Sequence, residues 1–231
     1  MEQDFLDELA AVTAQVAEAT ETEHASLGEF IRYEVTGRAD SPLAAIVLAA
    51  ALPANDTIDQ RGARIHLAVA MVLLDVALSL HKLLLLQQSA ADTLDKALVG
   101  GTVLAGDYCF SQAAVAASRT NNPQVVAIFS DLLKELSEAH LRHLFEKKPG
   151  NLNEFPALFQ SGGLAGAVLA GQDIAPQQAT ALFAASLAAA YRNEENEITP
   201  VPSVQTLAEQ VAENIAPHQH PRWLSLLERM G

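Results

Sequence analysis

The sequence predicts an all-α protein built as a bundle of about ten helices, and three observations carry this prediction. Apolar residues recur with a helical period along almost all of the 231 residues. Alanine and leucine, two strong helix formers, dominate among them. No segment shows the sustained alternation with β-branched side chains that is typical of strands. A chain of this length can bury a sizeable core, and one domain spanning 1–231 is the simplest interpretation.

Proline and glycine residues divide the chain into the expected helices. In chain order, the intervals between these breakers predict helices near 2–20, 27–36, 42–52, 60–88, 92–119, 122–147, 153–171, 176–196, 203–215 and 220–230. Three of them have recognisable starts: Asn122 precedes Pro123, Ser203 opens SVQTLAEQ, and Pro176 lies in a first turn. The stretch 193–203, NEENEITPVPS, is linker-like, and a loop is expected there.

The helices near 60–88 and 92–119 are apolar on nearly all faces. The first contains IHLAVAMVLLDVALSLHKLLLL, with scarcely one charged residue per two turns. A helix of this kind lies in the centre of a protein or in an interface. We therefore expect these two helices to be the most buried of the bundle.

Composition excludes several classes of protein. The 28 acidic residues against 14 Lys and Arg give a net charge of −14, which argues against binding to nucleic acid and indicates a solvated acidic surface. Cys109 is the one cysteine, so no internal disulfide can form, which fits a reducing cytoplasm. No apolar run reaches the roughly 18 residues of a membrane span, and the acidic N-terminus is unlike a signal peptide. A soluble cytoplasmic protein is expected.

Three stretches occur in the order and approximate spacing of one known family. They are HLAVAMVLLDVALSLHK, ending at Lys82; TVLAGDYCFSQAAVAAS, with LAGDY at 104–108; and ALFQSGGLAGAVLAG at 157–171. Together they resemble the isoprenyl diphosphate synthases, the trans-prenyltransferases of the polyprenyl synthetase family, from about residue 27 to the end. The resemblance implies an isoprenoid synthase-like helical fold, shortened in its C-terminal part. It also implies a dimer that pairs through central helices, including the one with LAGDY.

The chemistry implied by the resemblance requires acids that this chain lacks. In the family, Mg²⁺ joins an allylic diphosphate to two Asp-rich DDxxD motifs, since magnesium prefers hard oxygen ligands. After His81, the first motif is degenerate: Lys82, Leu83 and Leu86 stand at its acidic positions, and ammonium and alkyl groups cannot ligate Mg²⁺. The degenerate second motif aligns loosely with NEENEI, whose acids are Glu194, Glu195 and Glu197.

The cationic elements of the family are also reduced. Of the substrate loop GGKRxRP, the corresponding TGRADSP keeps only the charge of Arg38. Glu154-Phe155 replaces the Lys-Thr that precedes ALF. We therefore expect no catalytic residue, no metal and no cofactor, the ancestral Mg²⁺ being lost.

Several residues allow two interpretations. Leu83 to Leu86 either fill the core or form an apolar wall against a partner chain, and the three glutamates either bind a divalent ion or end a solvated helix. His140 and His143 share a helix face, which could suit Zn²⁺, but a hydrogen-bonded cavity histidine at His140 is preferred.

Asp75, His81 and His140 are the candidate residues of the old cavity. Asp75 needs a partner if it is buried, and Lys82 lies on the same face. Asp107 is interpreted as an acid at a helix N-terminus, and Tyr108 as a packing residue with its hydroxyl bonded nearby.

The leading hypothesis is a catalytically inactive homologue that acts as a non-catalytic or regulatory subunit of a prenyl diphosphate synthase. It would form a homodimer, or a heterodimer with a catalytic synthase, through a helix with small residues at Ala113, Ala114, Ala116, Ala117 and Ser118. The alternative is a standalone protein that binds a lipid or prenyl chain in the emptied apolar cavity. Residual activity through the glutamates of NEENEI is the third hypothesis.

Overall fold

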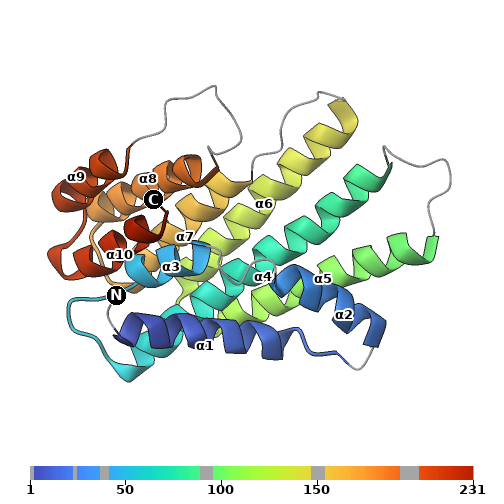
Figure 1. Cartoon of the computed structure of the whole chain (residues 1–231), viewed down its shortest axis with the longest axis horizontal. Helices are drawn as coiled ribbons and strands as arrows, with labels where there is room; N and C mark the ends of the chain where they lie inside the picture. The colour runs from blue at the N-terminus through green and yellow to red at the C-terminus, as the bar shows by residue number, and fades with distance from the viewer. Residues whose placement is uncertain are drawn as a thin grey trace.

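The structure is a computed structural model that describes residues 3–22, 25–36, 42–88, 96–146, 154–192 and 203–230. All regular elements in these ranges are helices (Figure 1). They are α1 (Gln3–Ala19), α2 (Ala25–Thr36), α3 (Pro42–Ala50), α4 (Ile58–Gln88), α5 (Lys96–Ser118), α6 (Pro123–Glu146), α7 (Phe155–Leu169), α8 (Ile174–Arg192), α9 (Val204–Asn214), the 3₁₀ turn η1 (Pro217–Gln219) and α10 (His220–Met230). The all-α prediction is confirmed.

The predicted helix starts are confirmed at the level of individual caps. The side chain of Asn122 accepts hydrogen bonds from the backbone N–H groups of Gln124 and Val125 at the start of α6. The Ser203 hydroxyl accepts one from Thr206 at the start of α9. These bonds satisfy N–H groups that have no partner inside a helix.

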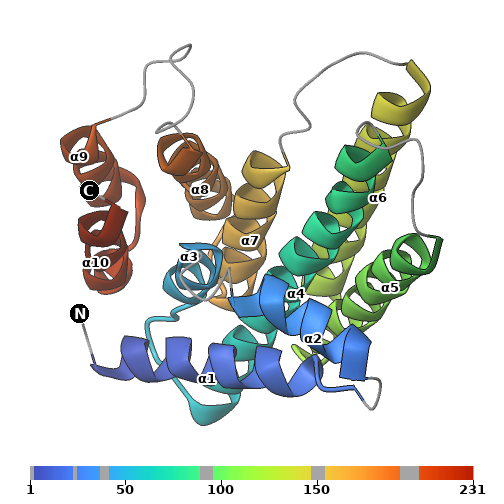
Figure 2. The same cartoon turned by 45° about the vertical axis from the view of Figure 1, so that its right-hand side comes forward.

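The helices form a bundle with α4 at its centre. This central helix packs on α5, α3, α1 and α7, and in Figure 1 α9 and α10 lie together at the edge opposite α5 and α6. Figure 2 shows α1 crossing beneath this arrangement, with α3 above it and against α7. Every residue of α3 is buried, as is almost all of α4 from Arg64 to Leu80.

Glycines set the closest approach between helices in the third family-like stretch. A Cβ added to Gly166 in α7 would lie 2.8 Å from the Cβ of Ala50 and 3.1 Å from the carbonyl oxygen of Val47, both in α3. One added to Gly163 would lie 2.7 Å from the Cβ of Ala184 in α8. The small residues of SGGLAG therefore allow α7 to pack tightly between α3 and α8.

The expectation that the helix near 92–119 is among the most buried is wrong for the single chain. One face of α5 packs on α4 through Ala105, Cys109 and Ala113, but the opposite face is exposed, with Leu104 64% and Val115 44% accessible. This second face has no cover within the described part of the chain, so an apolar sequence did not mean burial on both sides of α5. The prediction for the helix near 60–88 is confirmed.

The stretch Ile58–Leu83 is long and apolar enough to cross a membrane by length and composition alone. Of its apolar window, 83% is buried inside the bundle. The hydropathy of α4 is therefore that of a core helix and gives a membrane span no support.

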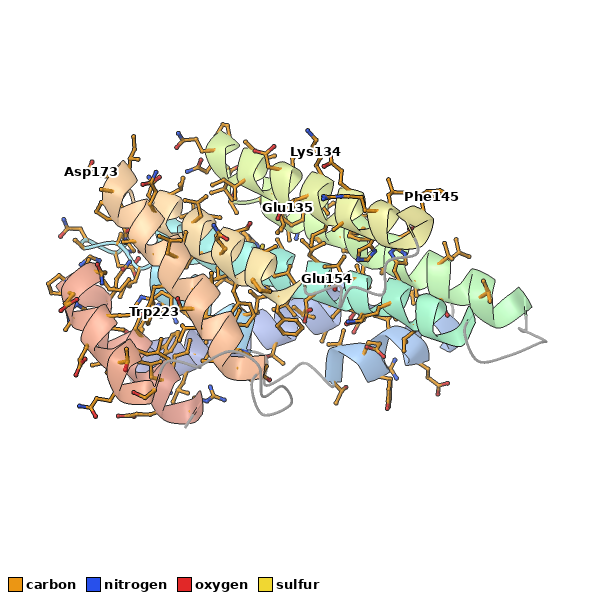
Figure 3. All side chains as sticks on the ribbon, turned by 90° about the horizontal axis from the view of Figure 1, so that it is seen from above. Lys134, Glu135, Phe145, Glu154, Asp173 and Trp223 are labelled. Atoms are coloured by element: carbon orange, nitrogen blue, oxygen red, sulfur yellow. The ribbon has the colours of Figure 1, made fainter. Side chains whose placement is uncertain are left out.

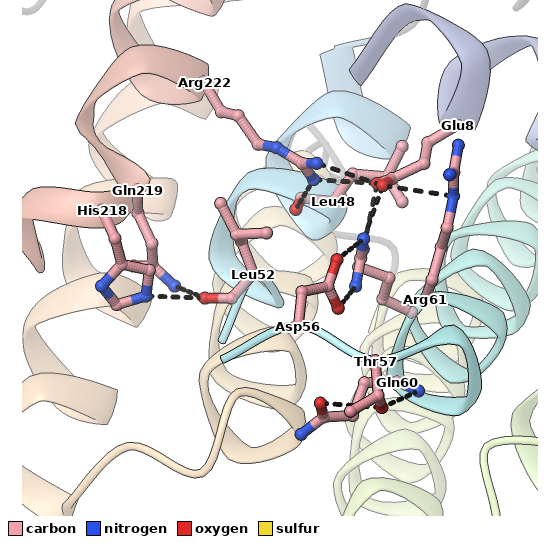
Figure 4. A network of polar contacts seen from close by, with 11 residues as sticks. Glu8, Leu48, Leu52, Asp56, Thr57, Gln60, Arg61, His218, Gln219 and Arg222 are labelled. Carbon is pink, nitrogen blue, oxygen red and sulfur yellow. Dashed lines mark hydrogen bonds and ion pairs between the residues drawn. The ribbon is translucent and has the colours of Figure 1, made fainter. Parts of the chain in front are cut away.

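A buried ionic network ties the two ends of the chain to the core (Figure 4). The carboxylate of Glu8 in α1 accepts hydrogen bonds from Arg64 in α4, at 2.5 and 3.0 Å, and from Arg222 in α10, at 2.8 and 3.1 Å. Asp56 accepts two further bonds of 2.6 Å from Arg64. Glu8 and both arginines are buried. Each of these three charges would be costly to bury alone, and together they compensate one another.

The same region closes the C-terminal end of α3. Arg222 also donates to the Leu48 carbonyl at 3.0 Å, and the Gln219 side chain donates to the carbonyls of Ala50 and Leu52, each at 2.8 Å. The last carbonyls of a helix have no partner within it. Side chains from α10 and η1 supply those partners, which fixes α3 against the C-terminal helices.

Candidate functional site

The candidate site lies where the C-terminal half of α4 faces α5, the end of α6 and the start of α7. Glu154 lies within the body of the molecule in Figure 3, whereas Lys134 lies on the outer side of α6. His81, Lys82 and Leu83 are half-buried in α4. Leu86 belongs to the same helix, but the side chains of residues 84–88 lie outside the described part of the structure. This is the region in which the resemblance places the first Asp-rich motif.

His81 is turned toward α5. Its Nε2 lies 3.5 Å from a carboxylate oxygen of Asp107, and its ring is 5.2 Å from that of Phe110. A Cβ on Gly106 would come within 2.3 Å of the His81 Nε2. The glycine of LAGDY therefore makes room for the imidazole of His81, next to the end of the family-like stretch in α4.

Asp107 does not begin a helix, which corrects the interpretation of its charge. It lies in the middle of α5, far from the N-terminal N–H groups, because the helix starts at Lys96. Its carboxylate is exposed and lies beside His81 instead. Tyr108 is as expected: its hydroxyl donates a 2.9 Å hydrogen bond to the backbone oxygen of Glu21, which joins α5 to the end of α1.

His140 in α6 makes a hydrogen bond with Glu154, in agreement with the prediction of a hydrogen-bonded histidine. Glu154 is buried and immediately precedes α7, where it makes no capping bond of its own. The imidazole therefore engages the carboxylate at the position where the resemblance leads one to expect a lysine. The side chain of His143 lies outside the described part of the structure.

Aromatic rings pack next to Glu154. Phe155 lies 6.5 Å from Tyr191 in a stacked arrangement and 5.8 Å from Phe159. Tyr191 comes from the last turn of α8, so these rings join the start of α7 to the end of α8. Such an aromatic cluster suits a hydrocarbon or a packed core, and its three rings carry no cationic group to hold a diphosphate.

The remaining predicted residues fall into two groups. Arg38 and the acids Glu194, Glu195 and Glu197 lie outside the described residues. Asp75 is buried, 5% exposed, in the middle of α4, and its pairing with Lys82 stays a prediction. Within the described ranges, no group of three or more His, Cys, Asp or Glu side chains is placed to hold a metal ion.

Burial also determines the state of Cys109. The thiol is fully enclosed between α5 and its neighbours, and this desolvation raises its pKa to about 12. A thiol in this environment stays protonated and unreactive. It is a packing residue.

Comparison with solved structures identifies the fold. The geranyl diphosphate synthase small subunit from Antirrhinum majus aligns with a TM-score of 0.71 at 15% identity, covering 99% of this chain and 100% of that chain. The chain has the isoprenyl synthase fold. A polyprenyl synthase from Caulobacter crescentus, complexed with calcium and isoprenyl diphosphate, aligns with a TM-score of 0.70 at 16% identity over 97% of this chain and 94% of that chain.

A third structure with this fold is a mint deletion mutant of heterotetrameric geranyl pyrophosphate synthase, which has a TM-score of 0.63 at 13% identity over 98% of this chain and 99% of that chain. No protein-family profile and no curated protein sequence matches the chain. The likeness is therefore one of architecture, and the isoprenyl synthase fold spans nearly the whole sequence.

Sequence reasoning missed the partners that define the site. Glu154 was singled out as a charge reversal and His140 as a bonded histidine, but nothing in a 14-residue separation indicated that they bond to each other. The Glu8–Arg64–Arg222 network was missed altogether. A signal was available at Glu8, an acid on the apolar face of α1 that Phe5, Val12 and Val16 define.

Proposed function

We propose that this chain is a non-catalytic, regulatory subunit of a prenyl diphosphate synthase. The observation that carries the proposal is the C-terminal half of α4, where Lys82 and Leu83 follow His81 at positions that the resemblance assigns to metal-binding acids. Neither side chain can ligate Mg²⁺. Without the metal, the charge of a leaving diphosphate has no counterion at this site.

The rest of the site supports the same proposal. Glu154 is a buried carboxylate at the start of α7, where a diphosphate would meet repulsion. Phe155 and Tyr191 fill the adjacent space between α7 and α8 with stacked rings. These groups favour a packed scaffold over an ionising site.

The exposed face of α5 supplies a surface for pairing. Val103, Leu104, Ser111, Ala114 and Val115 are exposed and recur at helical spacing on one side of the helix. The small residues of this helix lie on two faces. Ala113, Ala116 and Ala117 are buried inside the chain, whereas Ala114 and Ser118 are exposed and could contact another chain. We propose that this face contacts a catalytic synthase or a second copy of the chain, in the cytoplasm.

The comparison adds indirect support for a subunit role. Two of the proteins with this fold are described as a small subunit and as part of a heterotetramer. At 13–15% identity this is a likeness of fold, so the subunit role rests on the residues of the site.

The test is prenyl transfer by the purified chain alone. Isopentenyl diphosphate is supplied with Mg²⁺ and with dimethylallyl, geranyl or farnesyl diphosphate, and we expect no product above a control without protein. The triple variant Glu194→Gln, Glu195→Gln, Glu197→Gln separates intrinsic activity from contamination. Product that forms with the wild type and disappears with this variant would refute the proposal.

The alternative, a standalone lipid-binding protein that uses the emptied catalytic cavity, has less support at that location. The region between α4 and α7 holds the His140–Glu154 pair and the Phe155 cluster. A cavity lined by described residues lies between α1, α2, α3 and α10 and reaches this region only at Tyr191.

A further inference from the structure

A cavity of about 920 Å³ lies on the far side of α3 from α7. Its lining comes from α1, α2, α3 and α10, with Val72 of α4 and Tyr191 of α8. In Figure 2, α1 lies beneath α3, and α2 and α10 lie to either side of α3. The volume falls in the range of about 300–1,000 Å³ that is typical of sites for small organic ligands.

The floor of this cavity is apolar. It is lined by the nearly buried side chains of Val12, Val16, Ala44, Ala45, Val72 and Leu226. The small alanines of α3 leave the space that larger residues would fill. A surface of this kind favours a hydrocarbon chain over a polar solute.

The rim has the opposite charge to the protein as a whole. Arg32 of α2 and Arg229 of α10 both line the cavity and are exposed. Within the described ranges neither guanidinium has a carboxylate partner, and Glu21 is the one acidic residue among the lining side chains. In a chain with twice as many acids as Lys and Arg, two arginines that have no carboxylate partner among the described residues, at one apolar cavity, indicate a site for an anion.

We propose that this cavity binds an amphiphilic anion, a single hydrocarbon chain with a carboxylate or phosphate headgroup. The chain lies on the floor formed by α1 and α3, and the headgroup lies at the rim between Arg32 and Arg229. The cavity meets the region of Glu154 only at Tyr191, whose ring also stacks on Phe155, and none of its other described lining residues belongs to that region. It would serve a subunit of a synthase or a free protein equally. The proposal therefore stands or falls independently of the proposed function.

Calorimetric titration of the purified full chain tests the proposal. The probes are palmitate, farnesyl diphosphate and hexadecanol, the last being a neutral molecule with the chain length of palmitate. We expect saturable binding of one palmitate or one farnesyl diphosphate per chain, with hexadecanol at least tenfold weaker. Shortening the fatty acid by one methylene should weaken binding by about fourfold.

Substitutions on the exposed side of α1 locate the ligand. Ala17 lines the cavity and is exposed, so Ala17→Trp fills the space without disturbing the core, whereas Ala14→Trp on the same helix lies outside the lining. We expect Ala17→Trp to weaken binding at least tenfold and Ala14→Trp to leave it unchanged. Binding that survives Ala17→Trp would place the ligand elsewhere and overturn the proposal, as would failure of both anions to bind.

The headgroup contact has its own control. The double variant Arg32→Gln, Arg229→Gln should weaken binding of the anion at least tenfold and leave hexadecanol unaffected. Arg119→Gln, which removes an exposed arginine outside the lining, should change neither. Equal affinity for palmitate and hexadecanol would overturn the anionic part of the proposal.

Discussion

Replacing Glu8 by Gln removes the shared acceptor of the buried network and should destabilise the fold more than any other single change of one charge on α1. Glu8 is fully buried, and its two carboxylate oxygens accept four hydrogen bonds, two from Arg64 and two from Arg222. Gln has nearly the same shape, so the substitution tests the charge and the acceptors without leaving a cavity.

The geometry fixes the loss. The Oε1 atom of Glu8 accepts hydrogen bonds from the Nη2 groups of Arg64 and Arg222. Its Oε2 atom accepts hydrogen bonds from Nε of Arg64 and from Nη1 of Arg222. Whichever way the amide is oriented, its NH₂ faces two donors, so two of the four bonds are lost. At about 1.5–3 kcal/mol for a hydrogen bond to a charged group, the loss is about 3–6 kcal/mol. This agrees with about 3–5 kcal/mol for breaking a buried ion pair.

Urea denaturation followed by circular dichroism measures the effect. We expect the free energy of unfolding to fall by about 3–5 kcal/mol and the melting temperature by about 6–20 °C. Glu18→Gln, on the exposed side of the same helix, is the matched control and should change stability by less than about 0.5 kcal/mol. A loss below about 1 kcal/mol for Glu8→Gln, or a loss equal to that of the control, would refute this account of the network.

Three further predictions concern pH, packing and association. Burial would raise the pKa of Glu8, but hydrogen bonds from Arg64 and Arg222 outweigh it and hold this pKa below its ordinary value of about 4.5. The stability that Glu8 contributes is therefore present above that pH and is lost as the pH falls through the folded-state value. An unfolding free energy that does not fall in this acidic window, or that falls equally in Glu8→Gln, contradicts this. Gly166→Ala should destabilise the fold by about 1–3 kcal/mol, because its methyl carbon would lie 2.8 Å from the Cβ of Ala50 in α3. Gly62→Ala, with open space around it in α4, should stabilise the fold by about 0.5–1 kcal/mol. Equal effects in thermal melts would show that the contact of α7 with α3 is not tight. Ala114→Asp should place an unpaired charge in the pairing face of α5 and raise the dissociation constant of the pair at least about a hundredfold. Light scattering measures this, with Ala14→Asp on the exposed side of α1 as the control. A wild-type monomer at all concentrations, with no partner retained, would refute the pairing.

Local signals were sufficient to predict the helices. The breakers and caps around Asn122, Pro176 and Ser203 act within one turn, so a single sequence contains what is needed to place them. The glycines of SGGLAG and the Gly106 of LAGDY were recognised as motif residues, and the structure gives their cause: close contact with α3, α8 and His81.

Contacts between distant segments were not predictable in the same way. Glu8 and Arg222 are separated by 214 residues, and no spacing rule connects α1 with α10. The expected burial of α5 failed for a different reason, since an apolar sequence does not show whether its own chain covers both faces of a helix. The cavity beside α3 likewise depends on how α1, α2 and α10 meet, which the sequence of each helix leaves open.

The most direct test of the central claim, a subunit that regulates prenyl transfer without performing it, is the product profile of the synthase that the chain retains. The tagged chain is used to isolate its partner from the source cells, and products are compared for the partner alone, the chain alone and the two together. We predict no product from the chain alone, and a change in product chain length or rate when the chain joins the partner. Product from the chain alone that the glutamate triple variant abolishes, or a partner whose profile and rate do not change at saturating amounts of the chain, would contradict the claim.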